Sequence, residues 1–163
     1  MNEEARKKQN REMLSRVDKS IRGAVSAVLK DLEKQGQRPL IDKGVWRSPK
    51  EQEEKFKKGF SKVRWGFHCA TTPAGKPDSL AADIVDANKF WNASREFWLR
   101  LGASAIAHDL GWGGFFGLPS RMKAGLRAEL LHKNFKSPAK LGWDTAHIET
   151  TRVTIAQAKA GKR

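Results

Sequence analysis

Apolar residues recur every three or four positions through the first part of the chain: Leu14, Val17, Ile21, Val25, Val28 and Leu32. This is the period of an α-helix with one apolar face, and lysine, arginine and glutamate fill most of the other positions. Gly36 and Pro39 then favour an end to the helix. The pattern predicts one long amphipathic helix over residues 4–34. Such a helix either packs on a domain with its charged face in solvent or binds a membrane or a polyanion.

A second helix start is encoded by the segment Ser48-Pro49-Lys50-Glu51. It combines an N-cap serine, a proline at the first helical position and a glutamate that completes a capping box. A helix is therefore expected from Pro49 to about Lys58, with Gly59 at its C-terminal cap.

Short helical and extended patterns alternate at irregular spacing along the rest of the chain. They predict helices over residues 90–109 and 119–133 and strands over residues 81–87 and 147–155. Glycines and a proline predict an irregular loop in GWGGFFGLP, and the last residues, AQAKAGKR, are expected to fray. Because no strand–helix–strand unit repeats, we predict an α+β fold with a small antiparallel sheet flanked by helices.

The length of 163 residues suits one domain that buries a hydrophobic core. We divide it into a basic amphipathic helix (1–36), a core (38–150) and a tail (151–163). Hydrophobic residues make up 39% of the chain, which excludes a disordered protein. No apolar run approaches the ~18–20 residues of a membrane span. The start MNEEARKKQNREM has no apolar segment of a secretory signal.

Lysine and arginine outnumber aspartate and glutamate by 32 to 18, giving a formal net charge of +14. Such an excess favours polyanionic partners, which include nucleic acid, anionic lipid surfaces and acidic cell-wall polymers. Charge alone does not choose among them. The single cysteine, Cys69, excludes an internal disulfide framework.

Two of the four histidines stand outside ordinary helix surfaces. His108 and His132 fall near helix C-termini, where an imidazole complements the helix dipole. His68 and His147 lie beside the predicted strands, and together with Asp83 they would form a ligand set that zinc accepts. The spacing matches no short zinc motif. A core histidine bonded to a carbonyl and an ordinary strand-end carboxylate therefore remain alternatives.

The order of segments resembles the VanY-like zinc peptidases, which include D-alanyl-D-alanine carboxypeptidases, L-alanyl-D-glutamate endopeptidases and many phage endolysins. The resemblance covers roughly residues 38–150. It depends on six stretches: Val45-Trp46-Arg47-Ser48, Lys50-Glu51-Gln52-Glu53, Gly66-Phe67-His68, Ser79-Leu80-Ala81-Ala82-Asp83, Gly111-Trp112-Gly113-Gly114 and Trp143-Asp144-Thr145-Ala146-His147.

The resemblance implies a role for each matching residue. His68, Asp83 and His147 match the ligands of a Zn²⁺ ion, and Asp144 matches the catalytic carboxylate. Arg47 matches an arginine that would stabilise an oxyanion or hold a substrate carboxylate. The remaining residues expected to bind substrate are Trp112, Trp143 and Ser79; the two tryptophans can instead serve packing. Glu149 shares a strand face with His147, so it would either orient that imidazole or pair with a lysine.

This chain departs from the family pattern in three places. The segment CATTPAGKPD separates His68 from Asp83 by more residues than in the family, so it must bulge outward if both are to reach one metal ion. Gly66 replaces a serine. A basic stretch over residues 117–140 either lines the substrate cleft, anchors an anionic wall polymer or is a solvated helix face.

The function implied by the resemblance is zinc-dependent hydrolysis of a peptide bond in peptidoglycan stem peptides, with the L-alanyl-D-glutamate bond as the expected target. The alternatives are a D-Ala-D-Ala carboxypeptidase of the same family and a non-enzymatic protein that binds nucleic acid or another polyanion. In the peptidase interpretation we expect a monomer that binds anionic cell-envelope polymers rather than nucleic acid. As a phage endolysin, it would stay in the bacterial cytoplasm until another protein disrupts the membrane, and then reach the cell wall.

Overall fold

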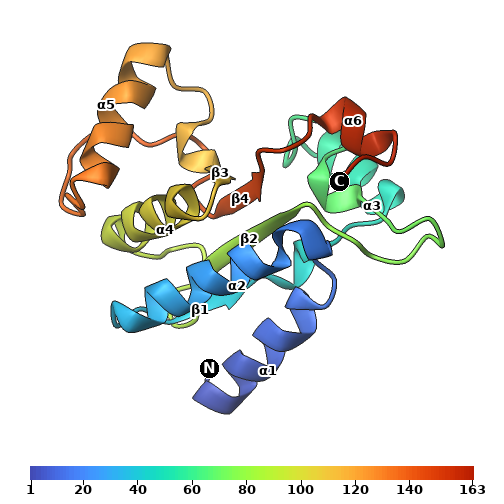
Figure 1. Cartoon of the computed structure of the whole chain (residues 1–163), viewed down its shortest axis with the longest axis horizontal. Helices are drawn as coiled ribbons and strands as arrows, with labels where there is room; N and C mark the ends of the chain where they lie inside the picture. The colour runs from blue at the N-terminus through green and yellow to red at the C-terminus, as the bar shows by residue number, and fades with distance from the viewer.

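Four short antiparallel strands form the centre of the molecule, in the order β1-β2-β4-β3. The computed structural model describes residues 1–163, and Figure 1 shows the helices around this sheet. The strands are β1 (Pro39–Ile41), β2 (Ala81–Asp86), β3 (Leu110–Trp112) and β4 (His147–Thr150). The helices are α1 (Glu3–Leu14), α2 (Lys19–Lys34), α3 (Pro49–Lys57), α4 (Arg95–Ala107), α5 (Ser120–Leu131) and α6 (Ile155–Lys159). The predicted α+β fold with a small antiparallel sheet is confirmed.

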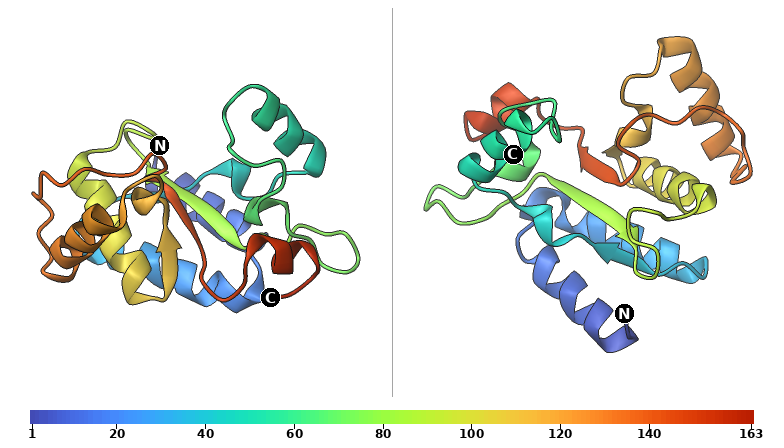
Figure 2. Two further views of the ribbon diagram at one scale, coloured as in Figure 1. Left: turned by 90° about the horizontal axis from the view of Figure 1, so that it is seen from above. Right: turned by 180° about the vertical axis from the view of Figure 1, so that it is seen from behind.

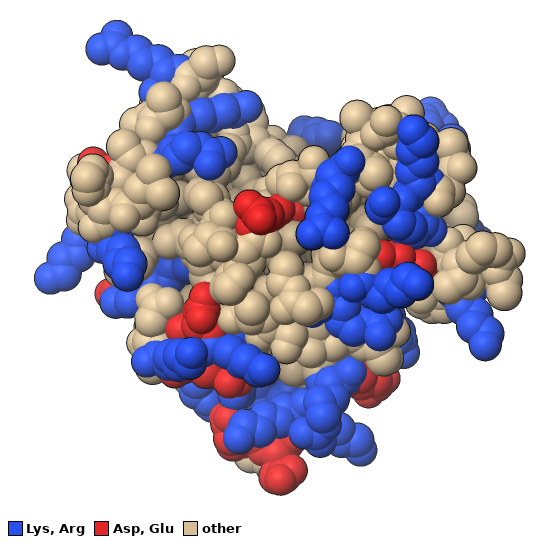
Figure 3. All heavy atoms as spheres, in the orientation of Figure 1, with Lys and Arg blue, Asp and Glu red and all other residues tan.

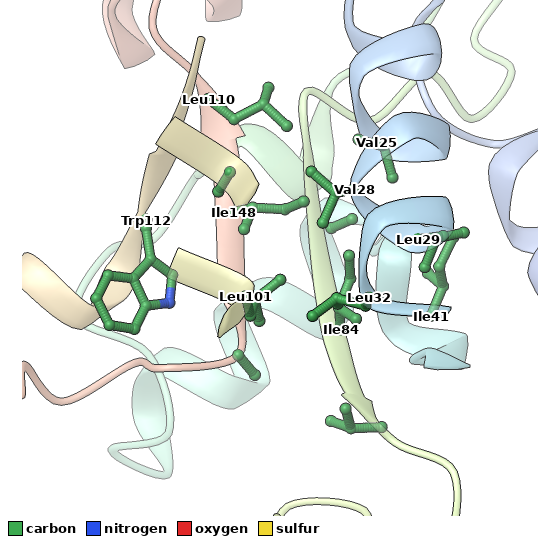
Figure 4. Packing of buried hydrophobic residues seen from close by; sticks show 14 of the residues in the cluster. Val25, Val28, Leu29, Leu32, Ile41, Ile84, Leu101, Leu110, Trp112 and Ile148 are labelled. Carbon is green, nitrogen blue, oxygen red and sulfur yellow. The ribbon is translucent and has the colours of Figure 1, made fainter. Parts of the chain in front are cut away.

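Side chains alternate between the two faces of the sheet, and the polar side chains of Asp83, His147 and Glu149 share one face, which also carries Val85. Ala82, Ile84 and Ile148 point into the main core, where α2 and α4 cover the sheet. Figure 4 shows this packing, with Val28 of α2 and Leu101 of α4 directed toward the strands. The alternate residues of β2 and β4 point to the opposite face, so this is the face on which functional side chains are available.

The single N-terminal helix expected over residues 4–34 is wrong, because the chain breaks between α1 and α2. Asp18 caps α2 by accepting a hydrogen bond from the backbone N–H of Ser20. Backbone bonds to Ser79 hold the break: Asp18 N donates to Ser79 O, and Ser79 N donates to Arg16 O, each at 2.8 Å. Apolar residues keep the same spacing across the break because Met13 at the end of α1, Val17 and the apolar residues of α2 all pack into one core.

Other expected elements differ at their ends. The helix starting at Pro49 is confirmed, with the capping box of Ser48 and Glu51. Ser94 caps α4, so this helix begins five residues later than expected. GWGGFFGLP is not irregular throughout, since it contributes the last two residues of β3 and a 3-10 turn over residues 113–115.

The C-terminal segment also needs correction. The last strand ends at Thr150, and the expected frayed tail contains the short helix α6, which has a capping box at Thr154 and buries Ala158. Ala158 packs in a small second core with Phe67, next to His68. No helix in the structure is both long enough and apolar enough to cross a membrane.

Candidate metal centre

Three side chains from separate parts of the chain meet on the face of the sheet opposite the one that α2 and α4 cover. Asp83 on β2 and His147 on β4 are direct partners in the antiparallel register. His68 comes from a 3-10 turn, Phe67–Cys69, that packs over them. All three are buried, and each offers one ligand atom within 4.8 Å of the other two. The convergence predicted for His68, Asp83 and His147 is therefore confirmed.

The donor atoms form a small triangle. His68 Nε2 lies 3.2 Å from His147 Nδ1 and 3.4 Å from Asp83 Oδ1, and His147 Nδ1 lies 3.1 Å from Asp83 Oδ1. In a tetrahedral site with bonds of about 2.0–2.1 Å, neighbouring donors are about 3.3–3.4 Å apart. The triangle thus has the size that a small divalent metal ion requires, and this group can hold a metal ion.

Hydrogen bonds outside the triangle fix both imidazoles. His68 Nδ1 donates to the backbone oxygen of Val45 at 2.8 Å, which leaves Nε2 facing the triangle. His147 Nε2 donates to Glu149 Oε2 at 2.8 Å, which leaves Nδ1 facing it. Such outer bonds hold the tautomer and the ring orientation of metal-binding histidines. The orienting role considered for Glu149 matches this contact.

Arg47 fixes the third donor. Its Nη2 donates to Asp83 Oδ2 at 2.7 Å, so Asp83 Oδ1 alone is directed toward the two imidazoles. The backbone N–H of Arg47 also donates to His68 O at 3.0 Å. Burial by itself raises the pKa of Asp83, but the imidazoles of His68 and His147 hold it well below its usual range. The carboxylate is therefore ionised, as a metal ligand must be.

His147 carries a proton when no metal ion is bound. Burial lowers its pKa, but hydrogen bonds to Asp83 and Glu149 outweigh burial and raise the pKa to about 10. A metal ion at Nδ1 must displace this proton. We predict release of about one proton per metal ion at pH 7–8. Calorimetric titration in two buffers of different ionisation enthalpy measures it, and equal heats in both would contradict the prediction.

The same proton affects the stability of the metal-free protein. Because the pKa is higher in the folded state than the ordinary value of 6.5, protonated His147 stabilises the fold fully below about pH 6.5. That contribution is lost as the pH rises through about 10. We expect the melting temperature of the metal-free protein to fall over this range, and to fall less in the variant His147→Gln.

The segment that separates His68 from Asp83 folds back on itself. Thr71 pairs with Pro77, Asp78 N donates to Ala70 O at 3.1 Å, and Gly75 takes the left-handed conformation at the tip, with φ of 76°. Figures 1 and 2 show the loop projecting away from the sheet. Its ends are joined close to both ligands, so the additional residues do not separate His68 from Asp83. This agrees with the expected outward bulge.

Asp144 lies in the same cleft, three residues before His147. Burial raises the pKa of Asp144. The charge of nearby His147 lowers this pKa, and the charge of Asp83 raises it further. A raised pKa favours a carboxyl group that accepts a proton in one step and donates it in another. Its placement beside the ligand set fits the role that the sequence suggested.

The Trp-Gly-Gly stretch holds Asp144 in place instead of contacting a substrate. Trp112 is 1% exposed, and its indole N–H donates to Thr145 O at 2.8 Å. Gly113 faces the backbone oxygen of Asp144, and a Cβ atom there would overlap with it. Gly114 O accepts from Gly142 N at 2.6 Å. The substrate-binding role expected for Trp112 therefore needs correction, because its ring is part of the core.

Gly113→Ala should displace Asp144 and the strand that follows. The Asp144 oxygen that faces Gly113 also accepts the backbone N–H of His147 at 3.2 Å, so both functional residues would shift. We expect a loss of about 1–3 kcal/mol in unfolding free energy and weaker metal binding. Thermal unfolding and metal titration measure these effects. Gly125→Ala is the matched control, since open space surrounds Gly125 on α5 and alanine favours the helix; an equal loss in both variants would contradict the prediction.

Ser79 also lies outside the cleft. It is fully buried, and its Oγ donates to Ala81 O at 2.7 Å. Its backbone supports the break between α1 and α2, as described above. Ser79 is therefore a structural residue, and the expected substrate contact needs correction. His108 and His132 are the C-caps of α4 and α5, in agreement with the prediction; His108 Nε2 also bonds Asp31 Oδ2 at 2.8 Å.

The ligand set forms the floor of a cleft of about 370 Å³. Trp143 lines it and is 56% exposed, so it is available to a bound molecule, as expected. Sequence reasoning missed two further exposed aromatic residues in its lining, Phe60 and Trp91, because both lie in turns without a recognisable motif. A larger cavity of about 700 Å³ lies among α2, α4 and α5, but it contains none of the metal-binding side chains.

Comparison with protein-family models, with curated proteins and with solved structures finds no match to this chain.

Proposed function

We propose that this protein is a zinc-dependent peptidase that cleaves a peptide bond in peptidoglycan stem peptides. The observation that carries the proposal is the buried triangle of His68, Asp83 and His147, with Asp144 in the same cleft. The motif order described above supplies the class of substrate.

The donor set suits zinc. Two imidazole nitrogens and one carboxylate oxygen are ligands that zinc accepts, and three protein ligands leave one tetrahedral position for a further group. A zinc ion held by His68, Asp83 and His147 would supply Lewis acidity and favour the ionisation of water at neutral pH.

The protein side chains carry the proton transfers in this proposal. Asp144, with its raised pKa, accepts a proton from water as the bond is attacked and donates one to the leaving amine. Arg47 holds Asp83 and also lines the cleft, so its guanidinium can stabilise negative charge that develops on the substrate. Glu149 keeps His147 in the tautomer that the site needs.

The cleft walls agree with a peptide that carries carboxylate groups. Lys55 and Lys62 line the cleft together with the exposed rings of Phe60, Trp91 and Trp143. Lysine side chains attract carboxylates, and the exposed rings provide apolar contact area. The L-alanyl-D-glutamate bond is the proposed target, and a carboxypeptidase acting on D-Ala-D-Ala is the second candidate of the same chemistry.

Mass spectrometry of fragments released from purified peptidoglycan tests the proposal. Zinc-loaded protein is expected to create new L-alanine C-termini and D-glutamate N-termini, whereas a carboxypeptidase would release free D-alanine. His147→Ala serves as the control without activity. The absence of any new terminus after digestion with zinc-loaded protein would overturn the proposal.

A non-enzymatic polyanion-binding protein is the competing function, favoured by the net charge of +14. It predicts binding that needs no metal ion and weakens steeply with salt. Chelator treatment separates the two functions, because only the peptidase should lose its activity. In the peptidase proposal, the protein acts on the wall of a bacterial host at lysis, and another protein opens the membrane to admit it.

A further inference from the structure

Two further hollows lie next to the cleft at the metal centre, on the side of Arg47. Arg47, Lys55 and Phe60 line both this cleft and a second hollow of about 560 Å³ beside α3. Arg16 and Lys43 line both the second hollow and a third, of about 320 Å³, beside α1. Because neighbouring hollows share wall residues, they follow one another along the surface from the metal centre to α1. We call the second and third hollows together the basic groove.

Free cationic groups line the basic groove. Lys8, Lys43, Lys55 and Lys58 are exposed, and none of them forms an ion pair within the protein. The wall carboxylates are fewer: Glu12 lies 3.4 Å from Arg16, Glu51 is held by the capping box with Ser48, and Glu54 is the third. The groove therefore has an excess of positive charge that the protein itself leaves without partners.

The overall charge does not by itself locate such a surface. Figure 3 shows lysine and arginine in several separate groups on one face of the molecule, with acidic side chains between them. The α5 region is also basic, with exposed Lys123, Lys136 and Lys140. What distinguishes the basic groove is that its cations line hollows that adjoin the candidate active site and share Arg47, Lys55 and Phe60 with it.

We propose that the basic groove binds the peptidoglycan polymer next to the bond that is cut, through carboxylates of neighbouring stem peptides. This inference rests on the proposed peptidase function. The alternation of lysines with glutamates suits a polymer whose charges are widely spaced. A nucleic acid, with one charge per about 1.7 Å of duplex, would meet repulsion from Glu12 and Glu54.

Binding to purified sacculi tests the groove separately from catalysis. Each protein carries Asp144→Asn so that it binds without cutting. The groove variant is Lys8→Gln, Lys43→Gln and Lys58→Gln, and the control is Lys123→Gln, Lys136→Gln and Lys140→Gln on and after α5. Both variants lose three positive charges. We expect the groove variant to bind sacculi about tenfold more weakly, with a reduced dependence on salt, and the control to bind nearly as well as the parent.

The following outcomes decide the proposal. Equal weakening in both variants would show that net charge acts without a defined site, and would overturn it. Loss of affinity for duplex DNA in the groove variant, with sacculus binding unchanged, would assign the groove to nucleic acid and also overturn it. With Asp144 intact, the groove variant should cleave sacculi more slowly yet cleave a soluble stem peptide at the parent rate. If the parent cuts no peptide but the groove still binds sacculi, the peptidase proposal fails and the groove assignment stands.

Discussion

His147→Ala should weaken zinc binding by about three orders of magnitude and abolish hydrolysis. The substitution removes one of three protein ligands, and zinc sites in proteins are worth ~10–16 kcal/mol in total, so a third of that sum is lost. The fold should survive, because Asp83 keeps its ion pair with Arg47. Competition titration against a chromophoric chelator measures the affinity, and circular dichroism checks the fold.

His132→Ala is the matched control for this variant. His132 is exposed at the end of α5 and takes no part in the ligand set, so its removal deletes an imidazole without touching the cleft. Its zinc affinity should equal that of the parent. A folded His147→Ala variant with unchanged zinc affinity would show that the ion binds elsewhere, and the proposed metal centre would be wrong.

Asp144→Asn should lower turnover by about 10²–10⁴-fold while zinc affinity changes little. Asparagine has nearly the same shape as aspartate but cannot accept and return a proton at neutral pH. Asp144 does not belong to the ligand triangle, so the metal ion should stay bound. Rates of stem-peptide cleavage and zinc titration of the same preparation provide the two measurements.

Asp109→Asn provides the control for the loss of a carboxylate. Asp109 is exposed in the turn between α4 and β3 and has a positive φ of 57°, a conformation that asparagine also tolerates. Its activity should match that of the parent. If Asp144→Asn cleaved as fast as Asp109→Asn, another group would be the proton carrier. If Asp144→Asn lost its zinc, Asp144 would be a ligand, and the assignment of roles would have to change.

Residues that act through local chemistry could be predicted from the sequence. Ser48, Pro49 and Glu51 define the start of α3 because a capping box needs only four consecutive residues. The convergence of His68, Asp83 and His147 is predicted through the resemblance in motif order, and the catalytic role of Asp144 stays a prediction. The sheet then explains why they meet, since Asp83 and His147 are partners in register.

Features that depend on tertiary contacts could not be predicted. The break between α1 and α2 is held by backbone bonds to Ser79, which is more than 60 residues away in the chain. The sequence around Trp112 is the same whether its ring contacts a substrate or packs in the core. The hydrogen bond from its indole N–H to Thr145 O, which depends on the fold, distinguishes these roles. The dense packing around Gly113 is likewise invisible in sequence, because a glycine in a loop ordinarily indicates only a turn.

The ion pair between Arg47 and Asp83 adds a second role to the one expected for Arg47. From sequence, Arg47 was expected to contact the substrate. Its guanidinium bonds the ligand carboxylate, so it also acts by orienting Asp83 toward the imidazoles. A metal ligand fixed on its second oxygen needs little rearrangement on binding, and this favours a site that is already formed before the metal ion arrives.

Titration of metal-free protein with zinc, with cleavage of purified peptidoglycan measured at each step, tests whether a metal ion at this site drives hydrolysis. We predict no cleavage without metal, a rise in rate that is linear in added zinc, and a plateau at one zinc ion per chain. Cleavage that is independent of zinc, or stoichiometric zinc binding at His68, Asp83 and His147 without any cleavage, would contradict this prediction.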